Sequence, residues 1–138
     1  MNTPFTSTSV LERAQTGEQH EYANRRRFTR YRTNLPVRVR DRQQRAHVGH
    51  CFVIAEGGLG ATLPESISVG SIVQLLFAVP GQSTPLKVLA LVRNQIDRQH
   101  GFEFLSLTDA DRQSIKEFCN QLAMSQRSAR EEYTTAHV

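Results

Sequence analysis

Short segments in which apolar and polar residues alternate, separated by glycine and proline, set the tightest limit on what this chain can fold into. The clearest begins at Leu35, where Val37 and Val39 alternate with Arg38 and Arg40. A two-residue period is typical of a β-strand with one buried face, here with a cationic outer face. Five further segments of strand length lie at 47–54, 59–63, 72–79, 86–93 and 101–105. We therefore expect a mostly all-β fold of six short strands.

Glycine and proline mark the ends of these strands. Because proline cannot donate a hydrogen bond to a strand ladder, Pro36 is expected at the start of the first strand. The sequence Glu56-Gly57-Gly58 predicts a tight turn in which a glycine takes positive φ. A second turn is expected at residues 80–83, where the sequence is Pro-Gly-Gln-Ser.

One helix is expected after the last strand. Thr108 is a suitable N-cap, and Asp109 and Asp111 favour the positive end of the helix dipole. A single apolar stripe follows at i, i+3, i+4 and i+7: Ile115, Phe118, Cys119 and Leu122. The helix is expected to end near Met124 and to fray from Ser125. Together these elements predict a small antiparallel β-barrel, closed or nearly closed, with the helix over an open end or edge.

Charge is concentrated in one part of the chain. The net charge is +4, but nine arginines and one acidic residue between Arg25 and Arg45 give that segment +8 and leave −4 for the rest. Fifteen of the seventeen basic residues are arginine. Since arginine pairs bidentately with phosphates and with guanine, this asymmetry indicates an anionic partner that docks at one end of the fold.

Several classes of protein are not indicated. The sequence has no pattern of a nucleophilic hydrolase, a P-loop enzyme or an HExxH protease, so we expect no enzyme. Cys51 and Cys119 have no disulfide or zinc spacing, and His47 and His50 have no third ligand nearby, so no metal or cofactor is expected. No signal peptide or membrane-spanning stretch is visible, which predicts a soluble cytoplasmic protein without a membrane partner.

Four features together resemble the PilZ domain family, which are bacterial receptors for the second messenger cyclic di-GMP. An arginine motif R-x-x-x-R is present at residues 26–30, just before the first strand. The glycine turn of the family's [D/N]-x-S-x-x-G motif falls on residues 53–58. Residues 101–104, Gly-Phe-Glu-Phe, are similar to the family's G-[VF]-x-F strand, and the helix at 109–124 closes the domain. The resemblance implies a six-stranded PilZ-like barrel with a C-terminal helix.

The resemblance also implies a domain division. The chain has 138 residues, enough for one domain of ordinary size and hardly for two. The PilZ-like domain is expected at 24–124. Residues 1–23 are rich in Thr, Ser, Gln and Glu without sustained periodicity, so they are expected to form a flexible N-terminal tail. Residues 125–138 are expected to form a polar C-terminal tail.

By resemblance, the ligand is cyclic di-GMP, a nucleotide bound without any further cofactor. Arg26 and Arg30 would be its principal contacts, with Arg25 and Arg27 assisting them. A guanidinium group can pair with a phosphate or a guanine edge, and it can stack on a purine. Four residues of extended chain separate two arginines by at most about 13 Å, enough to straddle a folded dinucleotide.

The second motif departs from the family's pattern. Val53 stands where the family has an acidic or amide residue, and Ala55 stands where it has serine, whereas Gly58 keeps the glycine. Ala55 and Gly58 would therefore contact the ligand only through main-chain groups and apolar surface. Loss of the two polar contacts would weaken the binding free energy for the ligand by about 1–4 kcal/mol, which lowers the affinity very roughly 5-fold to 1000-fold.

Two functions follow, and the sequence leaves both open. One is a cyclic di-GMP receptor or adaptor whose arginine segment clamps the ligand and which signals in trans to a protein effector. The alternative is a PilZ-like interaction or scaffold protein that binds no nucleotide and uses exposed apolar strand surface near Ile54. A nucleic-acid-binding barrel fits the charge, but only Phe28 and Tyr31 lie near the arginines for base stacking, so we expect no nucleic-acid partner. The chain is compatible with a monomer or a homodimer.

Overall fold

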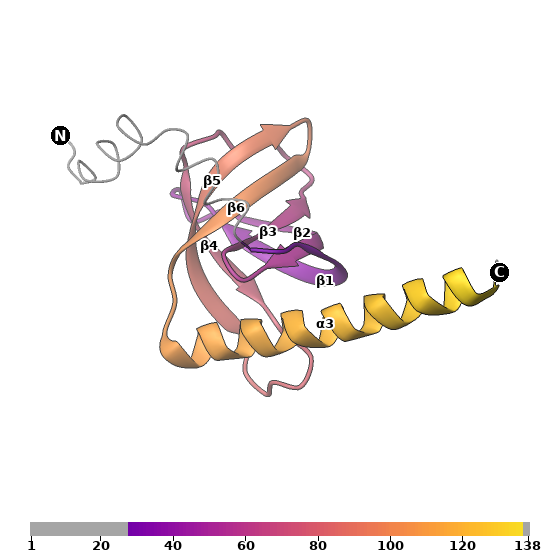
Figure 1. Ribbon diagram of the computed structural model, residues 1–138. Coiled ribbons are helices and arrows are strands. Elements are labelled where there is room, and N and C mark those ends of the chain that lie inside the picture. Colours follow the sequence, from indigo (N-terminus) through magenta and orange to yellow (C-terminus); the bar gives the residue numbers. More distant parts are fainter. Residues whose placement is uncertain (1–27, 137–138) are drawn as a thin grey trace, which may run out of the picture.

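The computed structural model describes residues 28–136, which form a closed six-stranded antiparallel barrel and one long helix (Figure 1). The strands are β1 (Tyr31–Arg40), β2 (Ala46–Ala55), β3 (Gly58–Thr62), β4 (Ile72–Phe77), β5 (Leu86–Ile96) and β6 (Gln99–Ser106), and the helix is α3 (Asp109–Ala136). Around the barrel the order is β1-β2-β3-β6-β5-β4. The expected fold class, a six-stranded barrel with a C-terminal helix, is confirmed.

Pairing of β1 with both β2 and β4 closes the barrel. Val37 lies opposite Phe77 of β4, and Val39 lies opposite Leu75. All four side chains are buried in the barrel core. Between them, Arg38 and Arg40 point outward and are exposed, as the two-residue period predicts.

The first strand is longer than expected, and Pro36 lies inside it. β1 begins at Tyr31, and its ladder with β2 is irregular between Arg32 and Leu35. The expectation that Pro36 starts the strand is therefore wrong. β4 pairs only with Val37–Arg40, so Pro36 lies where β1 is an edge on that side, and an edge tolerates a residue without an N–H group.

The β2–β3 turn is tight, but its glycines are not left-handed. Neither Gly57 nor Gly58 has a positive φ, which corrects the sequence-based expectation; the positive-φ glycines of the described residues are Gly70 and Gly81. A side chain at Gly58 would instead collide with the main-chain carbonyl oxygen of Phe102 on β6. Glycine is needed there for the close approach of β3 to β6.

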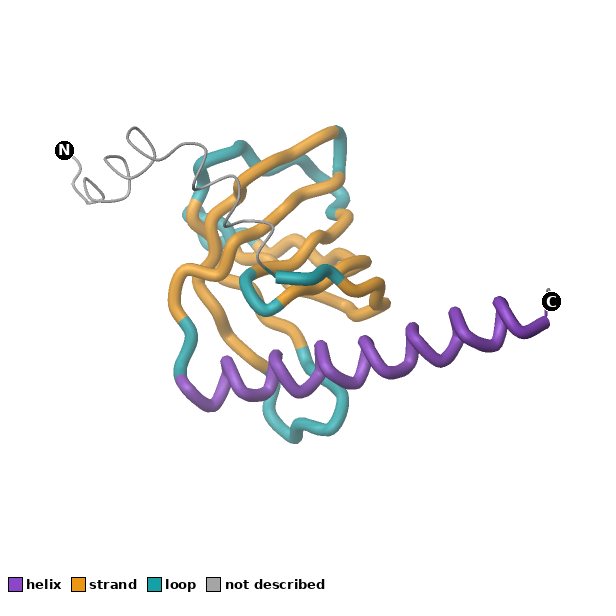
Figure 2. Tube along the Cα trace, viewed as in Figure 1, coloured by secondary structure: helices purple, strands orange, loops and turns teal. Residues whose placement is uncertain are grey.

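The first half of α3 covers one end of the barrel (Figure 2). The Thr108 hydroxyl accepts a hydrogen bond from the N–H of Asp111 at 3.0 Å, which confirms the N-cap. Ile115, Phe118 and Cys119 are buried in the same cluster as the barrel interior. Burial raises the pKa of the Cys119 thiol to about 11, and that of Cys51 to about 12, so both are neutral core groups.

The helix continues well past the expected end. α3 runs to Ala136, and its last turns extend beyond the barrel (Figure 1). The expectation that the chain frays from Ser125 is therefore wrong. Residues 123–136 contain no glycine or proline and are rich in helix-forming residues, so propensity carries the helix on where the apolar stripe has ended. None of the described residues forms a helix with the length and hydrophobicity of a transmembrane span.

Among the described residues the buried polar side chains are two histidines, His47 and His100. The N–H of Ile67 donates to Nε2 of His100 at 2.9 Å, and Nδ1 of His100 donates to the carbonyl oxygen of Arg98 at 2.9 Å. These two bonds fix a neutral imidazole that ties the β3–β4 connection to β6. Burial lowers the pKa of His100 below its ordinary value of 6.5, and the nearby His47 lowers it further.

This geometry predicts that stability falls in mild acid. Because His100 is held neutral in the fold, the unfolded chain binds an extra proton once the pH drops below about 6.5. Above that pH, proton binding by His100 does not change the free energy of unfolding. Below it, the free energy of unfolding decreases by at most about 1.4 kcal/mol per pH unit for one group. Urea unfolding of the wild type and His100→Gln at several pH values between 7.5 and 5 gives the free energy of unfolding as a function of pH. This free energy should fall less steeply with decreasing pH in the variant than in the wild type. Equal slopes would contradict this role of His100.

Candidate functional site

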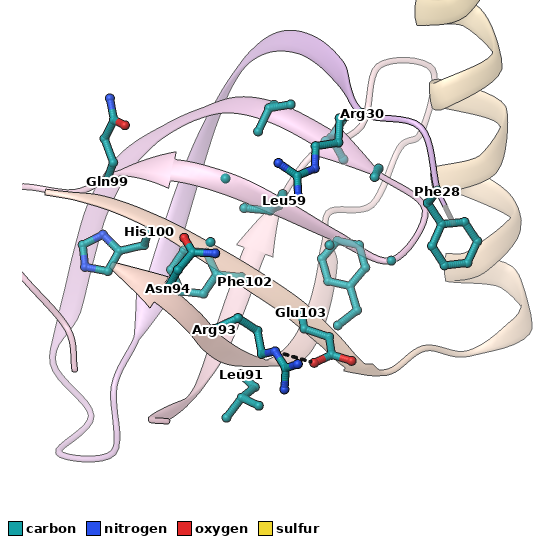
Figure 3. Close-up of a pocket in the computed structure, with 18 of the residues that line it drawn as sticks. Phe28, Arg30, Leu59, Leu91, Arg93, Asn94, Gln99, His100, Phe102 and Glu103 are labelled. Atoms are coloured by element: carbon teal, nitrogen blue, oxygen red, sulfur yellow. Dashed lines mark ion pairs between the residues drawn. The ribbon is translucent and has the colours of Figure 1, made fainter. Parts of the chain in front are cut away.

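A pocket of about 730 Å³ lies on the barrel wall formed by β2, β3, β6 and β5 (Figure 3). Its volume falls within the range of about 300–1,000 Å³ that small-molecule sites occupy. Three parts of the chain make it: the segment before β1, the β2–β3 hairpin and the β5–β6 hairpin. The pocket is therefore built from three separate segments of the chain, with lining residues from Phe28 to Leu105.

The centre of the pocket is a strip of glycines. Gly60 on β3 lies directly opposite Gly101 on β6, and Gly58 lies opposite Glu103. A strand glycine allows another group to approach the main chain closely. Here Cγ1 of Val53 comes within 2.7 Å of the place where a Cβ of Gly60 would be, and the Asn94 amide lies as near to that of Gly101.

Two strand bulges aim neighbouring side chains at this strip. The β2–β3 ladder shifts register between Cys51 and Val53, and both Phe52 and Val53 approach Gly60. The β5–β6 ladder shifts between Val92 and Asn94, and both Arg93 and Asn94 line the pocket. A bulge puts two residues of one strand opposite one residue of its partner, so adjacent residues can reach one side of the sheet.

The segment before β1 forms one side of the pocket. The ring of Phe28 lies over the β2–β3 turn, so close that a Cβ at Gly57 would come within 2.9 Å of its Cδ2 atom. This packing brings Arg30, whose side chain is exposed, to the pocket. Figure 3 labels Arg30 on one side and the Arg93–Glu103 pair on the other.

The opposite wall carries an ion pair. Nε of Arg93 lies 3.4 Å from Oε1 of Glu103 across the β5–β6 ladder, and their side chains are 25% and 46% exposed. Arg93 therefore forms a salt bridge and also lines the pocket. A partly exposed pair of this kind contributes only about 0–1 kcal/mol, so Arg93 can exchange Glu103 for another anion.

The structure brings three of the predicted contact residues together. Arg30, Ala55 and Gly58 line the same pocket, and Val53 lies beside them. Three further predicted contacts, Arg25, Arg26 and Arg27, lie outside the described residues.

Exposed apolar strand surface was expected near Ile54. Ile54 itself is fully buried in the core. Its neighbour Phe52 is the exposed apolar residue, at 37%. The bulge after Cys51 changes which β2 side chains face outward.

Sequence analysis missed the β5–β6 side of the pocket, where Asn94, Gln99 and Glu103 offer polar atoms. The segment from Asn94 to Gln99 reads as a polar connection, but β5 runs to Ile96 and β6 starts at Gln99. The turn between them is only two residues long, with Asp97 at a φ of 55°. The tendency of aspartate to adopt the left-handed conformation was the available signal for a tight hairpin.

Comparisons with known proteins agree with this architecture. The family model of the PilZ domain matches residues 24–121. Among curated proteins, none matches this chain by sequence. Similar solved structures include the PilZ domain of YcgR from Escherichia coli with c-di-GMP, which is 19% identical with a TM-score of 0.60. That match covers 80% of this chain and 98% of the YcgR domain.

Two other solved structures are similar at the level of the fold. The inhibitor of motility MotI/DgrA from Bacillus subtilis is 18% identical with a TM-score of 0.61, over 72% of this chain. This chain spans only 52% of that protein. The PilZ domain of CeSA from a cellulose-synthesizing bacterium is 16% identical with a TM-score of 0.56, over 69% of this chain and 98% of that domain. At these identities the likeness establishes a shared fold.

The glycine strip predicts a contrast between two substitutions. Gly58→Ala places a methyl group against the main-chain carbonyl of Phe102, which cannot move without disturbing the ladder. Gly101→Ala meets only the exposed Asn94 side chain, which can rotate away. We expect Gly58→Ala to lower the free energy of unfolding by about 1–3 kcal/mol and Gly101→Ala by clearly less. Urea unfolding at pH 7.5 measures both, and equal losses would contradict this account of the strip.

Proposed function

Because this chain belongs to the PilZ domain family, we propose that it is a receptor for cyclic di-GMP that holds the nucleotide in the pocket between the β2–β3 and β5–β6 hairpins. The observation that carries the proposal is the packing of Phe28 on Gly57, which brings Arg30, the last residue of the arginine motif, to the same pocket as Ala55 and Gly58. This supports a site that the two short motifs of the family's signature would share. The receptor domain is proposed to be residues 24–124.

Arginine supplies the main attraction for the ligand. Arg30 at the pocket and Arg26 four residues earlier would pair with the phosphates or with guanine O6 and N7, assisted by Arg25 and Arg27. Arg93 is a further cation on the opposite wall. The described charged residues that line the pocket are two arginines, Arg30 and Arg93, and one carboxylate, Glu103. This excess of positive charge favours a ligand with two negative charges.

The β2 side of the pocket can give the ligand little polar contact, and the β5–β6 side can replace part of it. Val53 and Ala55 present only aliphatic atoms and main chain. Asn94, Gln99 and Glu103 lie in the same pocket and carry amide and carboxylate groups suited to the polar edge of guanine. We propose that these side chains offset part of the loss at the second motif, which leaves weak but selective binding.

Signalling would occur in trans, by contact of the loaded receptor with a protein effector in the cytoplasm. The function is binding and not catalysis. The YcgR domain used for comparison carries c-di-GMP, and MotI is an inhibitor of motility. Those properties are those of YcgR and MotI. For this chain we propose the ligand and a protein effector, and we name no process that the effector controls.

A second candidate is a PilZ-like adaptor that binds no nucleotide. One observation favours it: the Val53 side chain fills the space beside Gly60, at the centre of the glycine strip. A ligand lying on the strip would have to displace that isopropyl group or lie above it. The adaptor would act through protein contacts alone, as a monomer or a homodimer.

Titration calorimetry with cyclic di-GMP tests the receptor. We expect selective binding over GMP and cyclic di-AMP, with affinity reduced about 10-fold to 150-fold in Arg30→Ala, since a hydrogen bond to a charged group is worth about 1.5–3 kcal/mol. Arg26→Ala/Arg30→Ala should abolish measurable binding. The matched control is Arg112→Ala, which removes an exposed arginine from α3, and its affinity should equal that of the wild type. Absence of heat at high ligand concentration with folded wild type would exclude the receptor.

Restoring the second motif separates the two candidates. Val53→Asp/Ala55→Ser supplies the two polar groups that the family's pattern has, and the aspartate replaces the isopropyl group beside Gly60 with a carboxylate. We expect affinity for cyclic di-GMP to rise about 5-fold to 1000-fold, corresponding to about 1–4 kcal/mol. Binding by the variant but not by the wild type would identify the adaptor. No gain in a variant with an unchanged circular dichroism spectrum would show that the pocket is not used as proposed.

A further inference from the structure

The barrel has a second distinctive surface, formed by the outward side chains of β1, β4 and β5 and called here the β1–β4–β5 face. Strand register fixes its layout, because residues paired across antiparallel strands project from the same side. Its three cross-strand rows are Arg38, Leu76 and Lys87; Arg40, Gln74 and Leu89; and Ile72 with Leu91. In Figure 1, β4 and β5 form one flank of the barrel above the start of α3.

Aliphatic groups on this face are exposed in a continuous patch. Ile72 is 48% exposed and Leu89 is 47% exposed, and they lie beside the half-buried Leu76 and Leu91. Val48 of β2, which is 60% exposed, lies on the other side of Arg38 and is separated by it from these aliphatic groups. Single exposed apolar residues are normal on a soluble protein, but a contiguous group with a polar rim marks an interaction site.

The rim of this patch carries three cations, and the carboxylate beside it, Glu103 opposite Leu91, is paired with Arg93. Arg38, Arg40 and Lys87 are exposed, and none of the ion pairs in the described part of the chain involves them. The three rows contain no acidic residue. A partner that covers this face therefore needs apolar side chains at its centre and negative charge at its edges.

The dimensions suit a helix. Neighbouring strands lie about 4.8 Å apart, and outward residues repeat about every 6.7 Å along a strand. Three strands and three rows therefore give a face about 10 Å by 13 Å, which matches two turns of an α-helix of about 10–12 Å diameter. A helix docked on the face would place leucine-type residues at its positions i, i+3, i+4 and i+7 against Leu76, Leu89 and Ile72. Glutamates beside that stripe on the helix would reach the cations at the rim of the face.

We propose that the β1–β4–β5 face is the docking surface for an acidic amphipathic helix of a partner protein. A second copy of this chain is disfavoured, because a symmetric contact would bring together two faces that both carry an excess of positive charge. The face has no aromatic side chain for base stacking, which disfavours a nucleic acid.

The proposal does not depend on what the pocket binds and goes beyond the function proposed for it. The two surfaces nevertheless touch, because Leu91 lies in the third row of the face and also lines the pocket. The Arg93–Glu103 pair follows directly along β5 and β6. A ligand in the pocket and a helix on the face would therefore be neighbours.

The test is a titration of the ¹⁵N-labelled full chain, followed by amide NMR, with a capped peptide of about 18 residues, five helical turns, that carries a leucine stripe flanked by glutamates. We expect shifts confined to β1, β4 and β5, and a loss of affinity of at least tenfold in Arg38→Glu/Lys87→Glu. Leu89→Asn should weaken binding similarly without changing the net charge. Arg112→Glu/Lys116→Glu is the matched control, since it makes the same charge change on exposed positions of α3 and should leave the affinity unchanged.

Further arms exclude the other occupants. A scrambled peptide of the same composition and a version with lysine in place of glutamate should not bind. Stronger binding to vesicles with phosphatidylglycerol or to a DNA duplex than to the acidic peptide would overturn the proposal. A dimer of the wild type in analytical ultracentrifugation that becomes a monomer in Arg38→Glu would also overturn it. So would the absence of amide chemical-shift changes when the peptide is added to folded wild type. The peptide titration is made without cyclic di-GMP, and the nucleotide is added in a separate experiment. If the chain does not bind the nucleotide, the result for the β1–β4–β5 face still stands.

Discussion

Closure of the barrel through the β1–β4 ladder is the constraint on which the rest of the structure depends. Only Val37–Arg40 of β1 takes part, opposite Gln74–Phe77 of β4. That short ladder removes the free edges of the sheet and buries both inner faces in one core. It also decides that every second residue of β1 faces water. The cationic outer face of β1 is therefore a consequence of closure, because Arg38 and Arg40 cannot turn inward without exposing Val37 and Val39.

A second constraint, the close approach of β3 to β6, shapes the pocket. Where Gly60 meets Gly101 the two residues carry no side chain of their own, and Val53 and Asn94 of the neighbouring strands lie against them. The bulges in β2 and β5 then turn adjacent residues toward the pocket. The pocket is thus made by irregularities of the ladder, whereas the core is made by its regular part. A barrel can keep its fold while the polar groups around such a pocket change, as Val53 and Ala55 illustrate.

Much of the fold could be predicted from the sequence, because alternation and capping are local signals. Six strands, the N-cap at Thr108 and the buried stripe of α3 all follow from residues near one another in the chain. The end of α3 was missed although its signal, helix propensity, is local, whereas the position of Pro36 and the role of Gly58 depend on a distant strand. Pro36 is tolerated inside β1 because β4 ends beside it, and Gly58 is needed because Phe102 lies against it. In the pocket, Ala55 and Gly58 follow a motif, but the bulge that turns Arg93 and Asn94 toward it has no sequence signature.

The concentration of arginine looks like one site in the sequence and becomes two places in the fold. Arg30 lies at the pocket, whereas Arg38 and Arg40 lie on the β1–β4–β5 face. Eight residues of strand separate Arg30 from Arg38 by about 25 Å, more than twice the Debye length at physiological ionic strength. The two groups therefore act on different partners and do not add into one field. At the pocket, cations converge on a space lined by glycine, which suits a compact anion. On the face, they surround aliphatic side chains, which suits an extended partner with both kinds of group.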